Sequence, residues 1–182
     1  MPNVSAHIGA ALKVKERLNI KDDIFLFGSI LPDIIDMNKM KSHYKERGTF
    51  YMIPNLEYYK SNYDLSNPLY LGYYFHLYLD YYYLEDYLEK NCKGIDVFNN
   101  KVYDDYDVLN NDLVKYYDID PIYIEDVLTR YSDDKVNKSK LNNNIRCLKL
   151  SKEGELKLLD KDKFISFIDK VIGMFVKELD KG

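Results

Sequence analysis

The sequence predicts an all-α fold, in which a single domain spanning residues 1–182 forms a bundle of five to seven helices. Apolar residues recur at helical spacing in several segments, most clearly in residues 161–181. Proline stands where several of these segments begin, a position that the first turn of a helix tolerates. Little of the chain alternates as a strand would, and 182 residues fit one domain with a sizeable core.

The first part of the chain contains two buried segments before its main helix. Ser5 can cap a first helix from Ala6 to about Leu18, which carries a partial apolar stripe. Residues 22–36, "DDIFLFGSILPDIID", form a second buried segment, within which a proline allows a short helix to start. We expect residues 48–68 to be mostly loop, with a helical turn or two.

The strongest helix follows Pro68 and runs from Leu69 to about Asn91. Residues 104–117 have the pattern of another helix. Residues 120–133 predict a further one, with proline in its first turn. These segments place most of the predicted helix in the middle of the chain.

The last part of the chain is less regular until its final helix. Residues 135–160 are polar, and their alternation predicts a small hairpin near residues 145–160 or an extended loop there. An amphipathic helix then closes the chain. Its apolar side consists of Phe164, Phe167, Ile168, Val171, Ile172, Phe175, Val176 and Leu179.

Composition narrows the classes of function. A net charge of −4 argues against nucleic acid as a stable partner, because such binding depends on clustered Lys and Arg. No apolar run approaches the roughly 20 residues that span a bilayer, and the N-terminus has no signal-peptide pattern. We therefore expect no transmembrane segment and a cytoplasmic location. Two cysteines without paired spacing indicate neither a disulfide framework nor a cysteine zinc site.

The stretch "YLGYYFHLYLDYYY" places His76 and Asp80 one helical turn apart. Residues four apart share a helix face, so both side chains point the same way, and Gly72 leaves space above the imidazole. Imidazole and carboxylate on adjacent turns suit zinc or a similar divalent ion. The same pair alone is also typical of a structural hydrogen bond or ion pair, so both interpretations stay open.

The other two histidines widen this pattern. His7 lies in "SAHIGAA" within the first predicted helix, and His43 lies in "KSHY", ten residues after Asp33 of "GSILPDI". These residues also have ordinary interpretations. His7 and His43 could be surface histidines, and Asp33 could cap a helix. Together with the pair described above they form an ordered series of possible metal ligands, which includes every histidine of the chain.

This series resembles the zinc-dependent phospholipase C family of bacteria, whose fold is shared with the fungal single-strand-specific nucleases. The four motifs "SAHIGAA", "GSILPDI", "KSHY" and "LGYYFHLYLDYYY" occur in the order that the family shows, over residues 1 to about 90. The resemblance implies one zinc-dependent phospholipase C-like domain. Without a signal peptide and without Trp, the chain looks like a divergent intracellular member.

The resemblance also implies a ligand set and a role for one residue. One metal would be held by Asp33, His43, His76 and Asp80, while Asp80 would bridge to a second metal that also takes His7. Two zinc ions are implied, with other divalent metals such as manganese as alternatives. Asp33 would ligate one metal and steer or deprotonate a water, which makes it the candidate catalytic residue.

The family's third metal site is the point of departure. The family has a histidine six residues after the bridging aspartate, where this chain has Asp86. The third site is therefore missing or rebuilt from oxygen ligands, with Asp86, Glu85 and Asp107 as candidates. The free amine of Pro2, after removal of Met1, is a further candidate ligand because secreted members use their terminal amine.

Two functions from different classes follow. The first is a metal-dependent phosphoesterase that uses a metal-activated water at a mono- or dinuclear His/Asp site, with a small soluble phosphoester or a lipid headgroup as substrate. The alternative is a non-catalytic, metal-stabilised helical binding module. Four basic residues near the second histidine could give a phosphate a positive rim, or they could form a solvated basic loop. They are Lys39, Lys41, Lys45 and Arg47.

Overall fold

Helices dominate the architecture of the computed structural model, which describes residues 2–91 and 101–180. The predicted all-α class is confirmed. Among the described residues, six helices have ten residues or more. They are α1 (Val4–Arg17), α6 (Pro68–Tyr82), α8 (Lys101–Tyr116), α9 (Pro121–Arg130), α10 (Lys138–Leu148) and α11 (Lys161–Leu179).

Shorter elements connect these helices. They are α2 (Ile24–Gly28), α3 (Leu31–Ile34), α4 (Lys39–Ser42), β1 (Lys45–Arg47), β2 (Met52–Pro54), α5 (Leu56–Asn62), the π-helical turn η1 (Tyr83–Tyr87) and α7 (Leu88–Asn91). The turn η1 continues α6 directly into α7. The predicted helix from Leu69 to Asn91 is therefore present, with a change of pitch in its second half.

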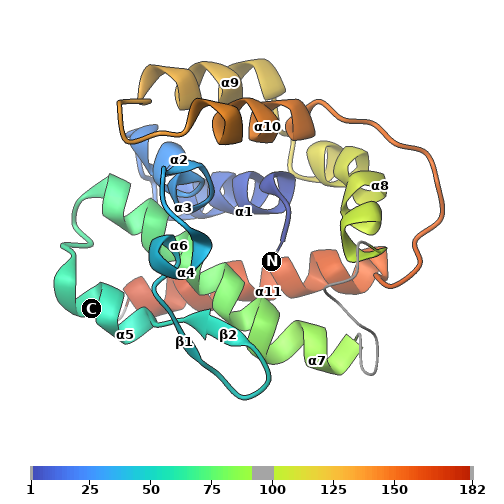
Figure 1. Ribbon diagram of the computed structural model, residues 1–182, viewed down its shortest axis with the longest axis horizontal. Coiled ribbons are helices and arrows are strands. Elements are labelled where there is room, and N and C mark those ends of the chain that lie inside the picture. Colours follow the sequence, from blue (N-terminus) through green and yellow to red (C-terminus); the bar gives the residue numbers. More distant parts are fainter. Residues whose placement is uncertain (1, 92–100, 181–182) are drawn as a thin grey trace.

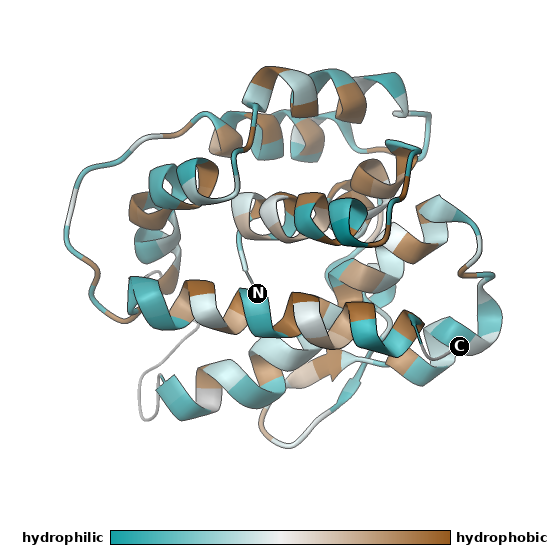
Figure 2. Ribbon diagram, turned by 180° about the vertical axis from the view of Figure 1, so that it is seen from behind, coloured by the Kyte–Doolittle hydropathy of each residue, from teal (hydrophilic) through white to brown (hydrophobic). Residues whose placement is uncertain are grey.

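The helix α1 lies between the two outer parts of the molecule (Figure 1). It contacts α2, α6, α8, α10 and α11, while α9 and α10 pack together on one side and the strand pair lies on the other. The buried apolar side chains form one continuous cluster. Most of the predicted apolar side of the last helix is buried in it, and Figure 2 shows α11 crossing the molecule with apolar and polar residues alternating around its turns.

Side-chain caps and prolines define where most long helices begin. Pro68 and Pro121 occupy the first turns of α6 and α9, as predicted. The predicted cap of the first helix is wrong, because Asn3 accepts the hydrogen bond from the Ala6 amide at 3.0 Å. Ser5 instead lies buried inside the first turn, where its hydroxyl bonds the side chain of Asn110.

The strand pair lies elsewhere than the predicted hairpin. Residues 45–47 and 52–54 form the antiparallel pair, whereas residues 138–148 are helical and residues 149–160 form the extended loop that was the second alternative. The Asn137 side chain caps this helix by accepting from the Lys140 amide at 3.1 Å. The apolar residues that read as strand alternation also fit the last turns of a short helix, so the pattern alone was ambiguous.

A close contact between α2 and α6 fixes the position of the central helix. A Cβ atom on Gly72 would lie 2.1 Å from the Phe25 carbonyl oxygen, and one on Gly28 would lie 2.3 Å from that of Leu69. The prediction that Gly72 leaves open space above the imidazole of His76 is therefore wrong. The backbone of α2 fills that space, because only glycine permits backbones to approach so closely.

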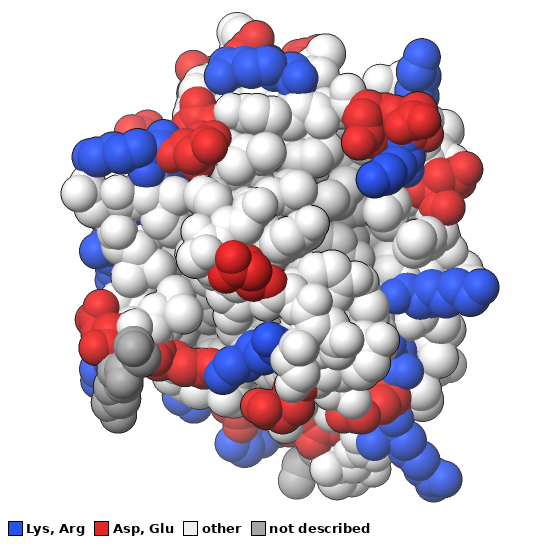
Figure 3. Space-filling view, turned by 90° about the vertical axis from the view of Figure 1, so that its left-hand side faces the viewer, with Lys and Arg blue, Asp and Glu red and all other residues white. Residues whose placement is uncertain are grey.

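The surface mixes charges of both signs. On the face shown in Figure 3, Lys and Arg stand beside Asp and Glu, and uncharged surface separates these groups. This face carries no continuous basic patch of the kind that binds nucleic acid. Within residues 2–91 and 101–180, no helix is both long and apolar enough to cross a membrane.

Candidate metal centre

Five side chains from four helical segments meet in the interior. His7 comes from α1, Asp33 from α3, and His43 from the residue that ends α4, while His76 and Asp80 come from successive turns of α6. The three histidines and Asp80 are fully buried, and the Asp33 side chain is 13% exposed. The five metal ligands predicted from the sequence motifs are thus brought together.

The spacing of His43, His76 and Asp80 is close to that of neighbouring ligands in a metal-coordination tetrahedron, and Asp33 lies beside them. The Nε2 atoms of His43 and His76 are 3.2 Å apart, and each lies 3.6 Å from Asp80 Oδ2. The Asp33 carboxylate lies 3.4 Å from His43 Nε2 and 3.9 Å from His76 Nε2. Zinc bonds of about 2.0–2.2 Å in tetrahedral geometry place neighbouring ligand atoms roughly 3.3–3.6 Å apart. Two overlapping groups of these side chains can therefore hold a metal ion, His43 with His76 and Asp80, and His7 with Asp33 and His76.

Hydrogen bonds orient two of the imidazoles toward the common centre. His76 Nδ1 donates to the Ser29 carbonyl of α2 at 2.8 Å, which leaves Nε2 to face the cluster. His43 Nδ1 lies 2.9 Å from the Ser42 hydroxyl, and the Tyr73 hydroxyl donates to the Ser42 carbonyl. Such outer partners are typical of metal-ligating histidines, because they fix the tautomer and the ring orientation.

The three histidines differ in protonation. Burial lowers the pKa of His7 to about 4, with a further contribution from His76, and burial also lowers the pKa of His43. Burial opposes the charge of His76 too, but Asp80 and Asp33 hold the pKa of this imidazole above its ordinary value. In the metal-free protein a proton on His76 thus balances the carboxylates, and a cation would displace it.

His7 completes the cluster from the far side of Asp80. Its ring stacks on that of His76 with centroids 3.9 Å apart and planes 8° apart, and its Nε2 lies 3.3 Å from Asp80 Oδ1. Neither ring nitrogen of His7 makes a hydrogen bond within the described chain. A neutral buried imidazole with a free nitrogen beside a carboxylate is well suited to ligate a cation.

The two carboxylates lie close to Lys39 and the histidines, but three of their oxygens lack hydrogen bonds among the described residues. Asp33 Oδ1 and both carboxylate oxygens of Asp80 are buried without a hydrogen bond in the part of the chain that the structure describes. Burial opposes their ionisation, but His76 above all holds the pKa of both carboxyls below the usual range. Buried oxygens that lack hydrogen bonds are costly, and a bound metal would satisfy all three.

The structure does not bring Asp86 to this cluster. Its carboxylate pairs with Lys90 and, at 3.2 Å, with Lys170 on the surface. Residues six apart are separated by about one and two-thirds helical turns, so Asp86 leaves the helix on a different face from Asp80. Glu85 accepts a hydrogen bond from the Thr49 amide, so this carboxylate too bonds away from the cluster.

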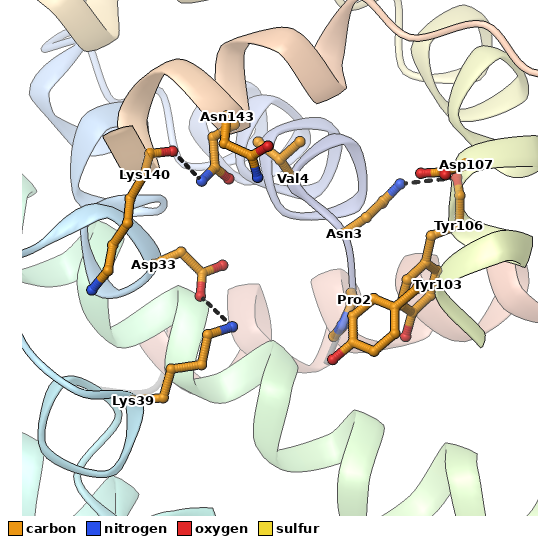
Figure 4. A pocket seen from close by; sticks show the side chains of 11 residues that line it. Pro2, Asn3, Val4, Asp33, Lys39, Tyr103, Tyr106, Asp107, Lys140 and Asn143 are labelled. Carbon is orange, nitrogen blue, oxygen red and sulfur yellow. Dashed lines mark hydrogen bonds and ion pairs between the residues drawn. The ribbon is translucent and has the colours of Figure 1, made fainter. Parts of the chain in front are cut away.

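A cavity of about 310 Å³ adjoins the cluster at Asp33. Figure 4 shows Asp33 and Lys39 on one side of this cavity, with the Asp33 carboxylate 3.4 Å from the Lys39 ammonium. Pro2, Tyr103, Asp107, Lys140 and Asn143 are among the other lining residues. Of the five cluster residues, Asp33 has the most exposed side chain, and it connects the buried ligands to this space.

The sequence motifs located the ligands but missed the groups that orient them. Ser29 and Ser42 carried no separate signal, although one lies inside "GSILPDI" and the other directly precedes His43. Pro2 lines the same cavity as Asp33, and its amine as a further ligand stays a prediction. No family model, no curated protein and no solved structure matches this chain.

Proposed function

We propose that the protein is a metal-dependent phosphoesterase, whose buried His/Asp cluster acts on a phosphate ester held in the adjoining cavity. The observation that carries this proposal is the position of Asp33. Its carboxylate belongs to the cluster and also borders the cavity, so a ligand in the cavity can reach the cluster. A purely structural metal site needs no such access.

The donor set fits zinc. Three imidazoles and two carboxylates are borderline and hard ligands that zinc accepts, and manganese also accepts the oxygens. One cation would take Asp33, His43, His76 and Asp80, and a second would lie between His7 and the other oxygen of Asp80. Bound divalent cations would lower the pKa of water and offset negative charge on phosphoryl oxygens.

The chain's own residues would position the reacting groups. Asp33 is ionised at neutral pH, because its pKa lies below the usual range despite burial. It can accept a hydrogen bond from a water molecule in the cavity and thereby orient that water's oxygen toward phosphorus. The low pKa makes Asp33 better at orienting the water than at retaining its proton.

The alternative is a metal-stabilised helical module without catalysis. Burial favours it, because four of the five cluster residues have no exposed surface. One cation with four protein ligands would also be a closed structural site. The two functions therefore differ in whether a ligand in the cavity reaches the metal.

Metal content followed by a screen of phosphomonoesters and phosphodiesters, with added zinc or manganese, distinguishes the two functions. We expect Asp33→Asn to keep most of the metal and to lower turnover by about 10²-fold, the scale of losing the orientation of a reacting group. Asp36→Asn is the matched control, since Asp36 lies outside the cluster and bonds Asn137. If the metal-loaded wild type turns over no ester, or if Asp33→Asn is as active as wild type, the structural alternative takes its place.

A further inference from the structure

Lys39 stands where the metal cluster meets the cavity. Its side chain is 63% exposed, lines the cavity, and among the described residues pairs only with Asp33. It begins the short helix α4, and His43 ends that helix. The same four-residue helix thus fixes a metal ligand and an ammonium group next to each other.

The second lysine of the cavity is already engaged. Lys140 donates to the carbonyl oxygens of Ile35 at 2.9 Å and Met37 at 2.7 Å, so it anchors the chain that leaves α3. Within residues 2–91 and 101–180, Lys39 makes no bond to a backbone oxygen. When Asp33 ligates a cation, the Lys39 ammonium becomes available to a ligand in the cavity.

The charges around the cavity favour a dianion. The carboxylates of Asp33, Asp80 and Asp107 outnumber the ammonium groups of Lys39 and Lys140 by one when the histidines are neutral, as metal binding requires. Two divalent cations would convert this single negative charge into three positive ones. A phosphomonoester, which carries two negative charges near neutral pH, offsets more of that charge than a diester with one.

The size of the cavity points to a small molecule. Its volume of about 310 Å³ lies at the lower end of the range of roughly 300–1,000 Å³ that is typical of small-molecule sites. Its lining includes the polar side chains of Lys39, Lys140 and Asn143, which can bind a phosphate group. A diester would need room for a second ester group beside the cluster.

We propose that the substrate is a small phosphomonoester, and that Lys39 is the residue that selects it by binding a non-bridging oxygen of its dianionic phosphate. This inference rests on the proposed phosphoesterase function. In the reaction the oxygen of water bonds to phosphorus, and the phosphorus–oxygen ester bond breaks with its electron pair on the alcohol oxygen. One proton of the water ends on that oxygen, so the products are an alcohol and inorganic phosphate.

The test compares zinc-loaded wild type, Lys39→Met and Lys41→Met on p-nitrophenyl phosphate and bis(p-nitrophenyl) phosphate. Lys41 is the matched control, because it is an exposed lysine of the same helix and does not line the cavity. Wild type should prefer the monoester. Lys39→Met should lower kcat/KM for the monoester by about 10–100-fold, the scale of a hydrogen bond to a charged group, and should change the diester value less than threefold. Lys41→Met should match wild type.

Inorganic phosphate binding gives a second readout that does not depend on turnover. Calorimetry on the zinc-loaded proteins should show about 10–100-fold weaker phosphate binding for Lys39→Met and no change for Lys41→Met. A preference for the diester, or an equal effect of Lys39→Met on both esters, overturns the inference while leaving the phosphoesterase function intact. Absence of turnover on every ester overturns the phosphoesterase function, and unchanged phosphate affinity in Lys39→Met overturns the role of Lys39 by itself.

Discussion

Replacing Gly72 by alanine should damage the metal centre from a distance, through the contact between α2 and α6. The added Cβ would lie 2.1 Å from the Phe25 carbonyl oxygen, whereas non-bonded heavy atoms prefer about 3.5 Å. The obstructing atom belongs to backbone, so α2 must retreat by roughly 1 Å. The Ser29 carbonyl moves with α2, and its bond to His76 Nδ1, now 2.8 Å, would then be lost or much weakened.

The expected loss of stability follows from three terms. Overpacking costs about 1–3 kcal/mol, and loss of a buried hydrogen bond costs about 1–3 kcal/mol more. The gain in helix propensity from glycine to alanine returns about 1 kcal/mol. The free energy of unfolding should therefore fall by about 1–5 kcal/mol, and the melting temperature by roughly 2–20 °C. Zinc affinity should weaken by about 10–100-fold, because His76 loses its orienting partner.

Gly173 provides the matched control for this substitution. It lies within α11, and a Cβ atom there would meet nothing within 4 Å. Gly173→Ala should therefore stabilise the protein by about 1 kcal/mol and leave zinc affinity unchanged. Chemical denaturation and competitive zinc titration of both variants measure these effects. If Gly72→Ala were as stable as wild type and bound zinc equally well, the close backbone contact would not be what positions His76.

Two other predictions concern the cluster itself. Zinc at about 1,000 times its Kd should raise the free energy of unfolding of wild type by about 4 kcal/mol. His76→Ala should abolish this rise, and Asp86→Asn should retain it. An equal response of both variants would contradict the proposed ligand set. In the metal-free protein the pKa of His7 is about 4, below the ordinary value of 6.5, so the unfolded chain binds a proton at this histidine first as the pH falls. The free energy of unfolding should therefore decrease between about pH 6.5 and pH 4. The loss in the free energy of unfolding should approach about 3 kcal/mol. His7→Gln should remove that part of the pH dependence in denaturation curves. If the pH profile of this variant equals that of wild type, His7 does not titrate as a buried group.

The residues of the His/Asp cluster could be predicted because their signals are local. His76 and Asp80 are one turn apart on a helix that Pro68 begins, and that spacing alone fixes their common direction. His7 and Asp33 lie in short motifs whose order along the chain was informative. Their convergence on one centre depends on long-range packing, which the resemblance implied and the fold provides.

The features that could not be predicted depend on contacts between distant segments. The sequence around Gly72 predicts open space beside the helix, because glycine has no side chain. Only the three-dimensional fold shows that the backbone of α2 occupies this space. The helix α10 was hidden because its few apolar residues also fit an extended stretch. The engagement of Asp86 by Lys170 joins residues 84 positions apart, a separation that no local pattern reveals.

The residues around the cavity come from two separate parts of the sequence, and these two parts can change independently of each other. The residues that could hold a metal all lie between residues 7 and 80, whereas Tyr103, Lys140 and Asn143 of the cavity wall come from α8 and α10. Substitutions in that wall can change the size and polarity of the accepted molecule while the cation-binding residues stay as they are. Selection for a new ligand would thus act on the later part of the sequence, and the His/Asp cluster would be inherited unchanged from the earlier part.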